Sequence, residues 1–214
     1  MKKGLIENLK YHLVDSTALL AESTPVFAAF EKGLAGMSDE VSITARLLAT
    51  GLTYFGGMGL VYAKGRDFSR KLFKITEKTS EKKQSIHDAL YLTAFNGVVS
   101  PLFYLASGAR NIDEIAIGTG ASMVLGLFNG APMGYSIDLF RDLTGLKNCE
   151  RPSYPNFLKR QSNKAKKGLA ALLIAGSLAL TAGIYKVIDD KPKEPEIPKT
   201  NNIEKVIAYN SSTQ

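Results

Sequence analysis

Two apolar segments without a single charged residue constrain this chain more than any other feature of its sequence. Residues Ile115–Ile137 and Gly168–Tyr185 contain no Asp, Glu, Lys or Arg. A surface helix of a soluble protein carries polar and charged residues on the face that points away from the core. Roughly 20 apolar residues, with a rise of about 1.5 Å each, are enough to cross the hydrocarbon core of a bilayer. Both segments are therefore expected to be membrane-spanning helices.

Three further segments carry few charges and are expected to span the membrane as well. They are Leu13–Phe30, Val41–Ala63 and Ile86–Ala109. The first is the weakest candidate because it contains Asp15, Glu22 and Pro25. The predicted fold class is all-α, a polytopic membrane helical bundle with four spans in two hairpins and a fifth, C-terminal span.

Lys and Arg concentrate in loops that alternate along the chain. Eight lie in Lys64–Lys83 and eight in Arg141–Lys167, whereas the loops after the first and third segments hold one each, Lys32 and Arg110. The positive-inside rule then places the N-terminus and both basic blocks in the cytoplasm. Basic blocks can also bind nucleic acid, but their position beside apolar segments favours a lipid bilayer, and no nucleic-acid partner is expected. The predicted location is the cytoplasmic (inner) membrane.

This pattern divides the chain into five parts. They are a cytoplasmic N-terminus (1–12), a four-span membrane domain (13–143), a basic cytoplasmic linker (144–167), a fifth membrane helix (168–188) and a tail (189–214). The tail is expected to be disordered because it combines prolines and mixed charge with little apolar content. No cleavable signal peptide is expected, because Glu7 and Lys10 interrupt the start of the chain.

Small residues recur at every fourth position of the fourth segment. The stripe consists of Gly118, Ser122, Gly126, Gly130 and Gly134. Lipid gives apolar side chains no reason to associate, so membrane helices pack where small residues let their backbones approach closely. We therefore expect this face to pack against another helix. A surface that slides or lines a substrate path is the alternative.

Two charged residues stand well inside the first two segments. A charge at bilayer depth costs at least about 2.5–3.5 kcal/mol, so it usually has a partner or a function. Glu22 is a candidate for carrying a proton, unless it is simply protonated or faces water. Arg46 would hold a substrate carboxylate, or form a gate with Glu31 or Glu22, unless its side chain escapes to the interface.

Further polar residues lie at segment ends and at mid-depth. Asp15, Asp88 and Asp138 fall at the predicted cytoplasmic ends, where Asp15 and Asp88 would cap helices and Asp138 would pair with Arg141. Alternatively, the three aspartates form an acidic mouth that attracts an α-ammonium group. The amides of Asn96 and Asn129 would bind a small zwitterion or another helix.

The chain offers little for catalysis. His12 and His87 are too far apart in sequence to suggest a metal pair, and Cys149 is the only cysteine. No nucleophile with a neighbouring base and no phosphate-binding loop is visible. We therefore expect neither an enzyme nor a bound cofactor or metal.

The order of the polar residues from about Val14 to Leu143 resembles a known family, the bacterial L-alanine exporters, which are small inner-membrane proteins with four spans. Asp15 opens the first segment, Glu31 precedes Gly36-Met37-Ser38, and Arg46-Leu47 follows. The remaining matches are Tyr62-Ala63-Lys64-Gly65-Arg66-Asp67-Phe68, Asp88, Phe95-Asn96 and Gly130-Ala131-Pro132-Met133-Gly134-Tyr135-Ser136-Ile137-Asp138. Asn96 stands where the family has a glutamine, and the fifth segment and the tail have no family counterpart.

The resemblance implies a secondary transporter that exports L-alanine or a similar small amino acid, with protons as the coupling partner of an antiporter. Among the carboxyl groups, the family-matched Asp15, Glu31, Asp88 and Asp138 compete with Glu22 for the coupling role. The full set of transport candidates is Asp15, Glu22, Glu31, Arg46, Asp88, Asn96, Asn129, Tyr135 and Asp138. Four or five spans enclose little volume, so a homo-oligomer is expected.

Two other readings stay open at the level of the sequence. One is a membrane scaffold or assembly protein that transports nothing and uses its glycine faces for packing alone. It has little need for Glu22, Asn96 and Asn129 at depth. The other is a soluble helical protein that only the fifth segment anchors.

Overall fold

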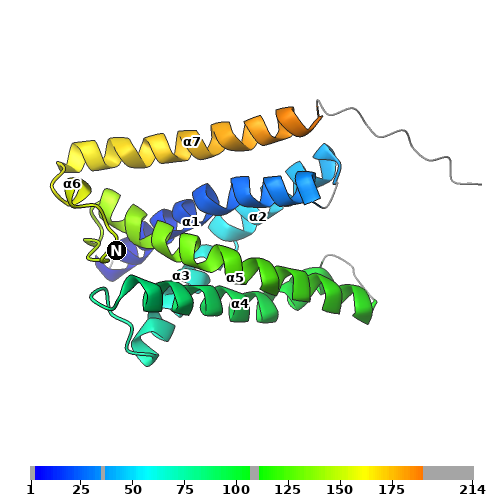
Figure 1. Ribbon diagram of the computed structural model, residues 1–214, viewed down its shortest axis with the longest axis horizontal. Coiled ribbons are helices and arrows are strands. Elements are labelled where there is room, and N and C mark those ends of the chain that lie inside the picture. The colour runs from blue at the N-terminus through cyan, green and yellow to red at the C-terminus, as the bar shows by residue number, and fades with distance from the viewer. Residues whose placement is uncertain (1–2, 35–36, 107–110, 190–214) are drawn as a thin grey trace, which may run out of the picture.

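The computed structural model describes every residue except 1–2, 35–36, 107–110 and 190–214. Its helices are α1 (Lys3–Ala29), the π-helical turn η1 (Phe30–Leu34), α2 (Asp39–Tyr54), α3 (Met58–Leu72), α4 (Glu81–Ala106), α5 (Ile112–Leu143), α6 (Asn156–Lys159) and α7 (Asn163–Asp189) (Figure 1). The described residues contain no strand, which confirms the all-α class. Of the predicted disordered tail, 190–214 lies outside the described residues, as does Arg110.

Helices α5 and α7 carry the two segments that are long and apolar enough to cross a membrane, Ile115–Leu143 and Asn163–Ile188. Few residues of either segment are buried. Large apolar side chains such as Ile117 and Phe128 on α5 and Leu172 on α7 are exposed instead. Such exposed apolar surface suits contact with lipid.

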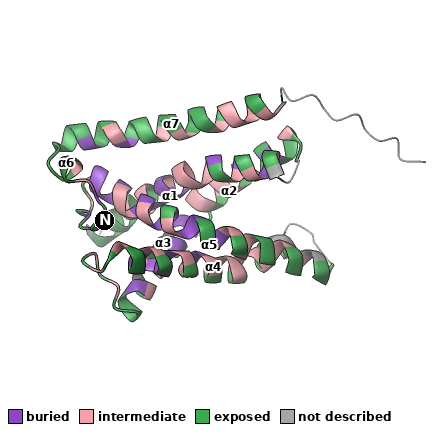
Figure 2. Ribbon diagram, viewed as in Figure 1, coloured by how far each residue is buried: buried purple, intermediate pink, exposed green. Residues whose placement is uncertain are grey.

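The other helices are arranged around α1 and α5. The most extensive contact joins α4 and α5, and α1 packs against α2, α3, α5 and α7. Figure 1 shows α7 along one side of the bundle, next to α1. Figure 2 shows that the buried residues gather in the half of the bundle that contains the N-terminus.

Gly126, Gly130 and Gly134 of the small-residue stripe of α5 face α4. A Cβ atom on Gly126 would lie 3.0 Å from Cα of Thr93, and one on Gly130 would lie 2.5 Å from Cα of Ala89. One on Gly134 would overlap the carboxylate of Asp88. Next to them, the Asn96 amide donates a hydrogen bond to the carbonyl oxygen of Ser122 at 2.7 Å. Any side chain at these glycines would push the two helices apart.

The prediction of one continuous helix over Val41–Ala63 is wrong. Helix α2 ends at Tyr54 and α3 begins at Met58, because Gly57 adopts a left-handed conformation with a φ of 74°. Such a conformation interrupts a helix and is easiest for glycine. The 16 residues of α2 extend over about 24 Å, less than the roughly 30 Å of the hydrocarbon core.

Helix α1 satisfies backbone groups that this break exposes. His12 lies 2.7 Å from the carbonyl oxygen of Tyr54, and the Ser16 hydroxyl donates to the carbonyl oxygen of Thr53 at 3.3 Å. Irregular backbone at membrane depth is tolerated where protein supplies such partners. The break thus packs against α1 on one side, while the side chain of Phe55 is exposed.

Candidate functional site

Arginine and aspartate side chains form a buried cluster at the end of the bundle where α3, α4 and α5 meet. Fully buried Arg66 uses its Nε and Nη2 atoms to donate to the two oxygens of Asp88, each at 3.1 Å. The same guanidinium donates to Asp138 at 3.1 and 2.8 Å. Arg70, one turn further along α3, binds Asp88 through Nε and Asp138 through Nη1, both at 3.0 Å.

Two more arginines extend this arginine cluster. Arg141 on α5 binds Asp15 with two hydrogen bonds of 2.7 and 2.8 Å, and it also binds Asp67. Arg151 reaches Asp138 at 3.2 Å, and its guanidinium lies 5.1 Å from the ring centroid of Tyr135. The cluster thus joins α1, α3, α4, α5 and the segment that follows α5.

The structure differs here from two expectations drawn from the sequence. Asp15 and Asp88 do not cap helices, because α1 begins at Lys3 and α4 begins at Glu81. Asp138 pairs with Arg66, Arg70 and Arg151 instead of Arg141. Each of the three aspartates is bound by a guanidinium, so the expected acidic mouth is a charge-balanced network.

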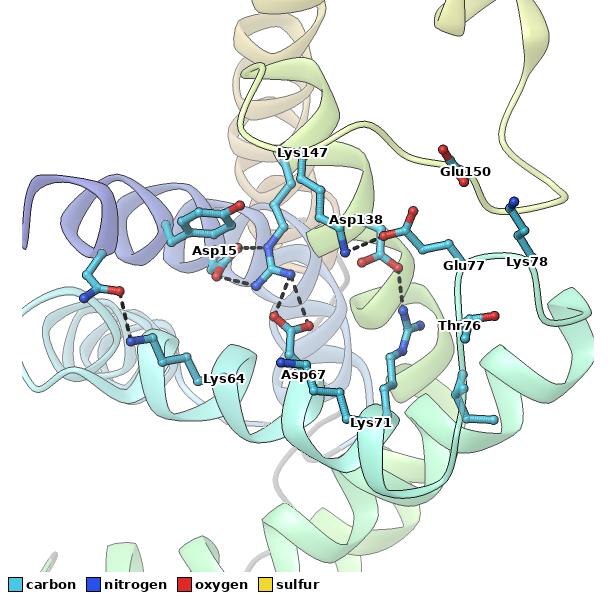
Figure 3. A pocket seen from close by; sticks show the side chains of 15 residues that line it. Asp15, Lys64, Asp67, Lys71, Thr76, Glu77, Lys78, Asp138, Lys147 and Glu150 are labelled. Atoms are coloured by element: carbon cyan, nitrogen blue, oxygen red, sulfur yellow. Dashed lines mark hydrogen bonds and ion pairs between the residues drawn. The ribbon is translucent and has the colours of Figure 1, made fainter. Parts of the chain in front are cut away.

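The arginine cluster borders an open pocket of about 750 Å³ (Figure 3). Asp15, Asp67 and Asp138 line this charged pocket together with Lys64 and Lys71. Figure 3 also shows Glu77 beside Lys147, with which it forms an ion pair. The pocket wall therefore carries both signs of charge.

A second, smaller cavity lies between the helices. It measures about 240 Å³, and residues from each of α1 to α5 line it. Its wall is mostly apolar, with side chains such as Leu19, Phe95 and Met133. The polar residues of its wall are Ser23, Arg46, Thr53, Tyr62, Asn96 and Asn129. Among the described residues, Arg46 is the only charged one in this lining. An apolar pocket with a few placed polar groups is the usual form of a small-molecule site.

Two residues of this central cavity have buried polar atoms without a hydrogen-bond partner among the described residues. They are Nε of Arg46 and the hydroxyl oxygen of Tyr62. Buried polar groups in proteins are almost always satisfied, so each exception needs an explanation. Nη2 of Arg46 already binds Glu31, and its guanidinium lies 4.8 Å from the ring centroid of Phe27.

The structure also brings Glu22 and Asn129 together. The Asn129 amide donates to the Glu22 carboxylate at 3.0 Å, and Asn129 lines the central cavity. The partner of Glu22 is thus a neutral amide, whereas Asp15, Asp88, Asp138 and Glu31 each bind a guanidinium. Among the sequence candidates, Glu22, Arg46, Asn96 and Asn129 lie at or beside the cavity, while Tyr135 lies by the arginine cluster.

Sequence reasoning missed Tyr62 and the arginines of the cluster as site residues. Arg66 and Arg70 sit in the block Lys64–Lys83, whose eight cations indicate a solvated loop. A usable signal was their spacing of four residues, which places both on one helix face. No comparable local signal marks Arg151, and the short spacing of Asp138 and Arg141 predicted a different ion pair from the one that Arg141 forms with Asp15.

For side chains outside the predicted spans, burial and hydrogen bonds determine how the pKa is shifted. For Glu81, burial favours the neutral acid, but hydrogen bonds from Ser153 and Arg151 outweigh it and lower the pKa. Burial raises the pKa of Cys149 to about 11, so the thiol stays protonated at neutral pH. The described residues contain no group of three His, Cys, Asp or Glu side chains placed to hold a metal ion.

Comparison with known families shows to which family the chain belongs. The model of the L-alanine exporter family (AlaE) matches residues 5–147, which is more than half of the chain. The chain belongs to the L-alanine exporter family. It is a membrane transporter and not an enzyme, which confirms the resemblance read from the sequence and the predicted export of alanine. Membership also implies the cytoplasmic membrane. The match ends before α6 and α7. No curated protein and no solved structure was found to match.

Proposed function

We propose that this L-alanine exporter binds alanine in the central cavity, with the substrate carboxylate on Arg46. The observation that carries the proposal is the unpartnered Nε of Arg46 in the wall of a 240 Å³ cavity. The guanidiniums of Arg66, Arg70 and Arg141 each bind an aspartate through the edge formed by Nε and Nη2. In Arg46 and Arg151 only Nη2 of this edge has a partner. Of the two, Arg46 lines the central cavity, so half of a carboxylate-binding fork is unpaired there.

The other end of the zwitterion meets Glu22 and Asn129 in this proposal. Their oxygens accept hydrogen bonds from the α-ammonium group, and the Tyr62 hydroxyl donates to the substrate carboxylate. The methyl group packs on the apolar wall, which includes Leu19 and Leu92. Asn96 keeps its bond to the Ser122 carbonyl and shapes the wall.

Glu22 is the proposed proton carrier. Protonating a carboxyl that binds an arginine leaves a buried guanidinium without its counter-ion, which is strongly unfavourable. That applies to Asp15, Asp88, Asp138 and Glu31. Glu22 binds the neutral Asn129 amide, so it can gain and lose a proton without breaking an ion pair. Protons moving inward through this group would drive alanine outward.

The charged pocket is the proposed cytoplasmic entrance. Lys64, Lys71, Lys78 and Lys147 line it, and such an excess of lysines is typical of the cytoplasmic side. This orientation makes α1, the broken pair α2–α3, α4, α5 and α7 five spans and puts the C-terminus outside. Tyr135 and the arginine cluster then close the inner end. A homo-oligomer stays a prediction.

A reporter fusion tests this orientation. A reporter that is active only in the cytoplasm should be active after Ser80 and inactive after Gln214. The reason is that Ser80 belongs to a basic loop, whereas α7 carries the chain through the bilayer once more. Activity of the reporter after Gln214 would remove α7 as a span.

Protection of an introduced cysteine tests the position of the substrate site. In a Cys149→Ser background, Ala49→Cys places one thiol in the wall of the central cavity. We expect alanine at ten times its Kd to slow labelling by a small maleimide about tenfold, because bound alanine blocks access. Ser80→Cys, an exposed loop position, is the matched control whose labelling rate should not change. Equal labelling rates with and without alanine in the Ala49→Cys variant would contradict the proposed site.

A further inference from the structure

Helix α7 lies outside the family match, yet ion pairing and hydrogen bonding hold it to the bundle near both of its ends. Near its start, Lys166 forms an ion pair of 2.8 Å with Asp142 on α5, and both side chains are nearly buried. Near its end, the Tyr185 hydroxyl lies 2.7 Å from Oγ of Ser42 on α2. Between these points α7 packs along α1 and buries Ala170. The helix is thus an integral part of the described bundle.

The donor and the acceptor of the hydrogen bond between Tyr185 and Ser42 can be assigned. The hydroxyl of Ser42, which is fully buried, donates its one proton to Oε2 of Glu31 at 2.6 Å. Ser42 therefore accepts from Tyr185, because a serine hydroxyl has one hydrogen to donate. The result is a chain of hydrogen bonds from Tyr185 through Ser42 to Glu31, whose other oxygen binds Arg46. Bonds in such a chain polarise one another, so Tyr185 strengthens the bond that Ser42 gives to Glu31.

We infer that Tyr185 is a positioning residue of the exporter, which stabilises the Glu31 carboxylate through Ser42 when Arg46 turns from Glu31 to the substrate. The inference rests on the proposed binding of the alanine carboxylate by Arg46. Both Nε and Nη2 are needed for a two-bond grip on that carboxylate, so Glu31 must give up Nη2. Glu31 is buried, and a buried carboxylate that loses its cation needs other donors.

The expected consequence is a change in apparent affinity with little change in maximal rate. Without the Tyr185 hydroxyl, the Glu31 carboxylate is less stable in the state in which Arg46 has left it. Glu31 therefore binds Arg46 more tightly. Alanine must then compete against a stronger internal ion pair. A hydrogen bond of this kind corresponds to a factor of about two to ten in an equilibrium.

The experiment compares single and double variants of the full chain in vesicles. Tyr185→Phe removes only the hydroxyl and should raise the alanine concentration for half-maximal efflux about two- to tenfold. Thr181→Val is the matched control, because the Thr181 hydroxyl donates to the Ser177 carbonyl of its own helix. It should leave that concentration unchanged. In a Ser42→Ala background, Tyr185→Phe should have no further effect, because the chain of hydrogen bonds to Glu31 is already interrupted.

Thermal unfolding of the purified variants gives a readout that does not depend on transport. Tyr185→Phe should lower the melting temperature in the wild-type background and leave it unchanged in the Ser42→Ala background. Unchanged half-maximal concentration in Tyr185→Phe, or an equal further rise in the Ser42→Ala background, would overturn the inference. If the wild-type protein moves no alanine, the proposed function fails and the transport role of Tyr185 falls with it. The melting temperatures then still decide whether Tyr185 acts on Ser42.

Discussion

Arg46→Ala is expected to reduce alanine efflux by more than a hundredfold while the protein stays in the membrane. Arg46 is the one charged residue in the described lining of the central cavity. A carboxylate on its Nε–Nη2 edge would lose two charge-assisted hydrogen bonds, each with a net contribution of about 1.5–3 kcal/mol. Efflux of labelled alanine from cells or vesicles, normalised to the amount of membrane-inserted protein, measures the loss. Arg46→Lys keeps the charge without the fork and should restore only part of the activity.

The ion pair with Glu31 requires a control, because Arg46→Ala also leaves a buried carboxylate alone. That defect by itself can destabilise a protein by about 3–5 kcal/mol. The double variant Arg46→Ala with Glu31→Gln removes the unpaired charge. It should fold like the wild type and still fail to export alanine. Recovery of efflux in the double variant would contradict substrate binding by Arg46 and would leave it only a structural role.

Glu22→Gln is expected to abolish the response of transport to a pH gradient while alanine exchange continues. Glutamine still hydrogen-bonds Asn129, so the packing beside the cavity is preserved. Glutamine cannot bind and release a proton, so the pH gradient can no longer drive transport through this residue. The ratio of efflux rates with and without the gradient should fall to about one in this variant. Glu7→Gln, an exposed carboxyl near the start of the same helix, should keep the wild-type ratio.

The separation of the two activities distinguishes coupling from packing. An equal loss of exchange and of gradient-driven efflux in Glu22→Gln would indicate a damaged bundle. Unchanged gradient-driven efflux would move the coupling role to Asp15, Glu31, Asp88 or Asp138. If the carboxyl-to-amide variants at all five positions keep the response, proton coupling through these side chains is wrong.

The sequence predicted those features of the fold that depend on residues close together in the chain. The absence of charge in Ile115–Ile137 and Gly168–Tyr185 gave the apolar helices α5 and α7. The four-residue spacing of glycines indicated a packing face, and that face lies on α4. The break at Gly57 was missed because an apolar average over Val41–Ala63 hides a Gly-Gly pair, although such pairs often mark turns.

The site was harder to predict because its contacts join residues far apart in the chain. Arg141 binds Asp15 over 126 positions, and Asn129 binds Glu22 over 107. Only the folded bundle brings such partners together. Glu22 and Arg46 are candidates from the sequence alone, because a charge in an apolar segment is conspicuous by itself. Of Glu22 and Glu31, the two partners predicted for Arg46, Glu31 is the one that binds it.

Alanine efflux from vesicles that contain the purified protein tests the central claim most directly. The vesicles are loaded with labelled alanine and diluted into buffer of equal or lower pH. We expect efflux above that of protein-free vesicles. The acidic outside buffer should accelerate it several-fold, and an uncoupler should return it to the rate seen at equal pH. An efflux rate that is the same with and without the pH gradient would contradict proton coupling. No efflux above protein-free vesicles in either buffer would contradict alanine transport by this chain.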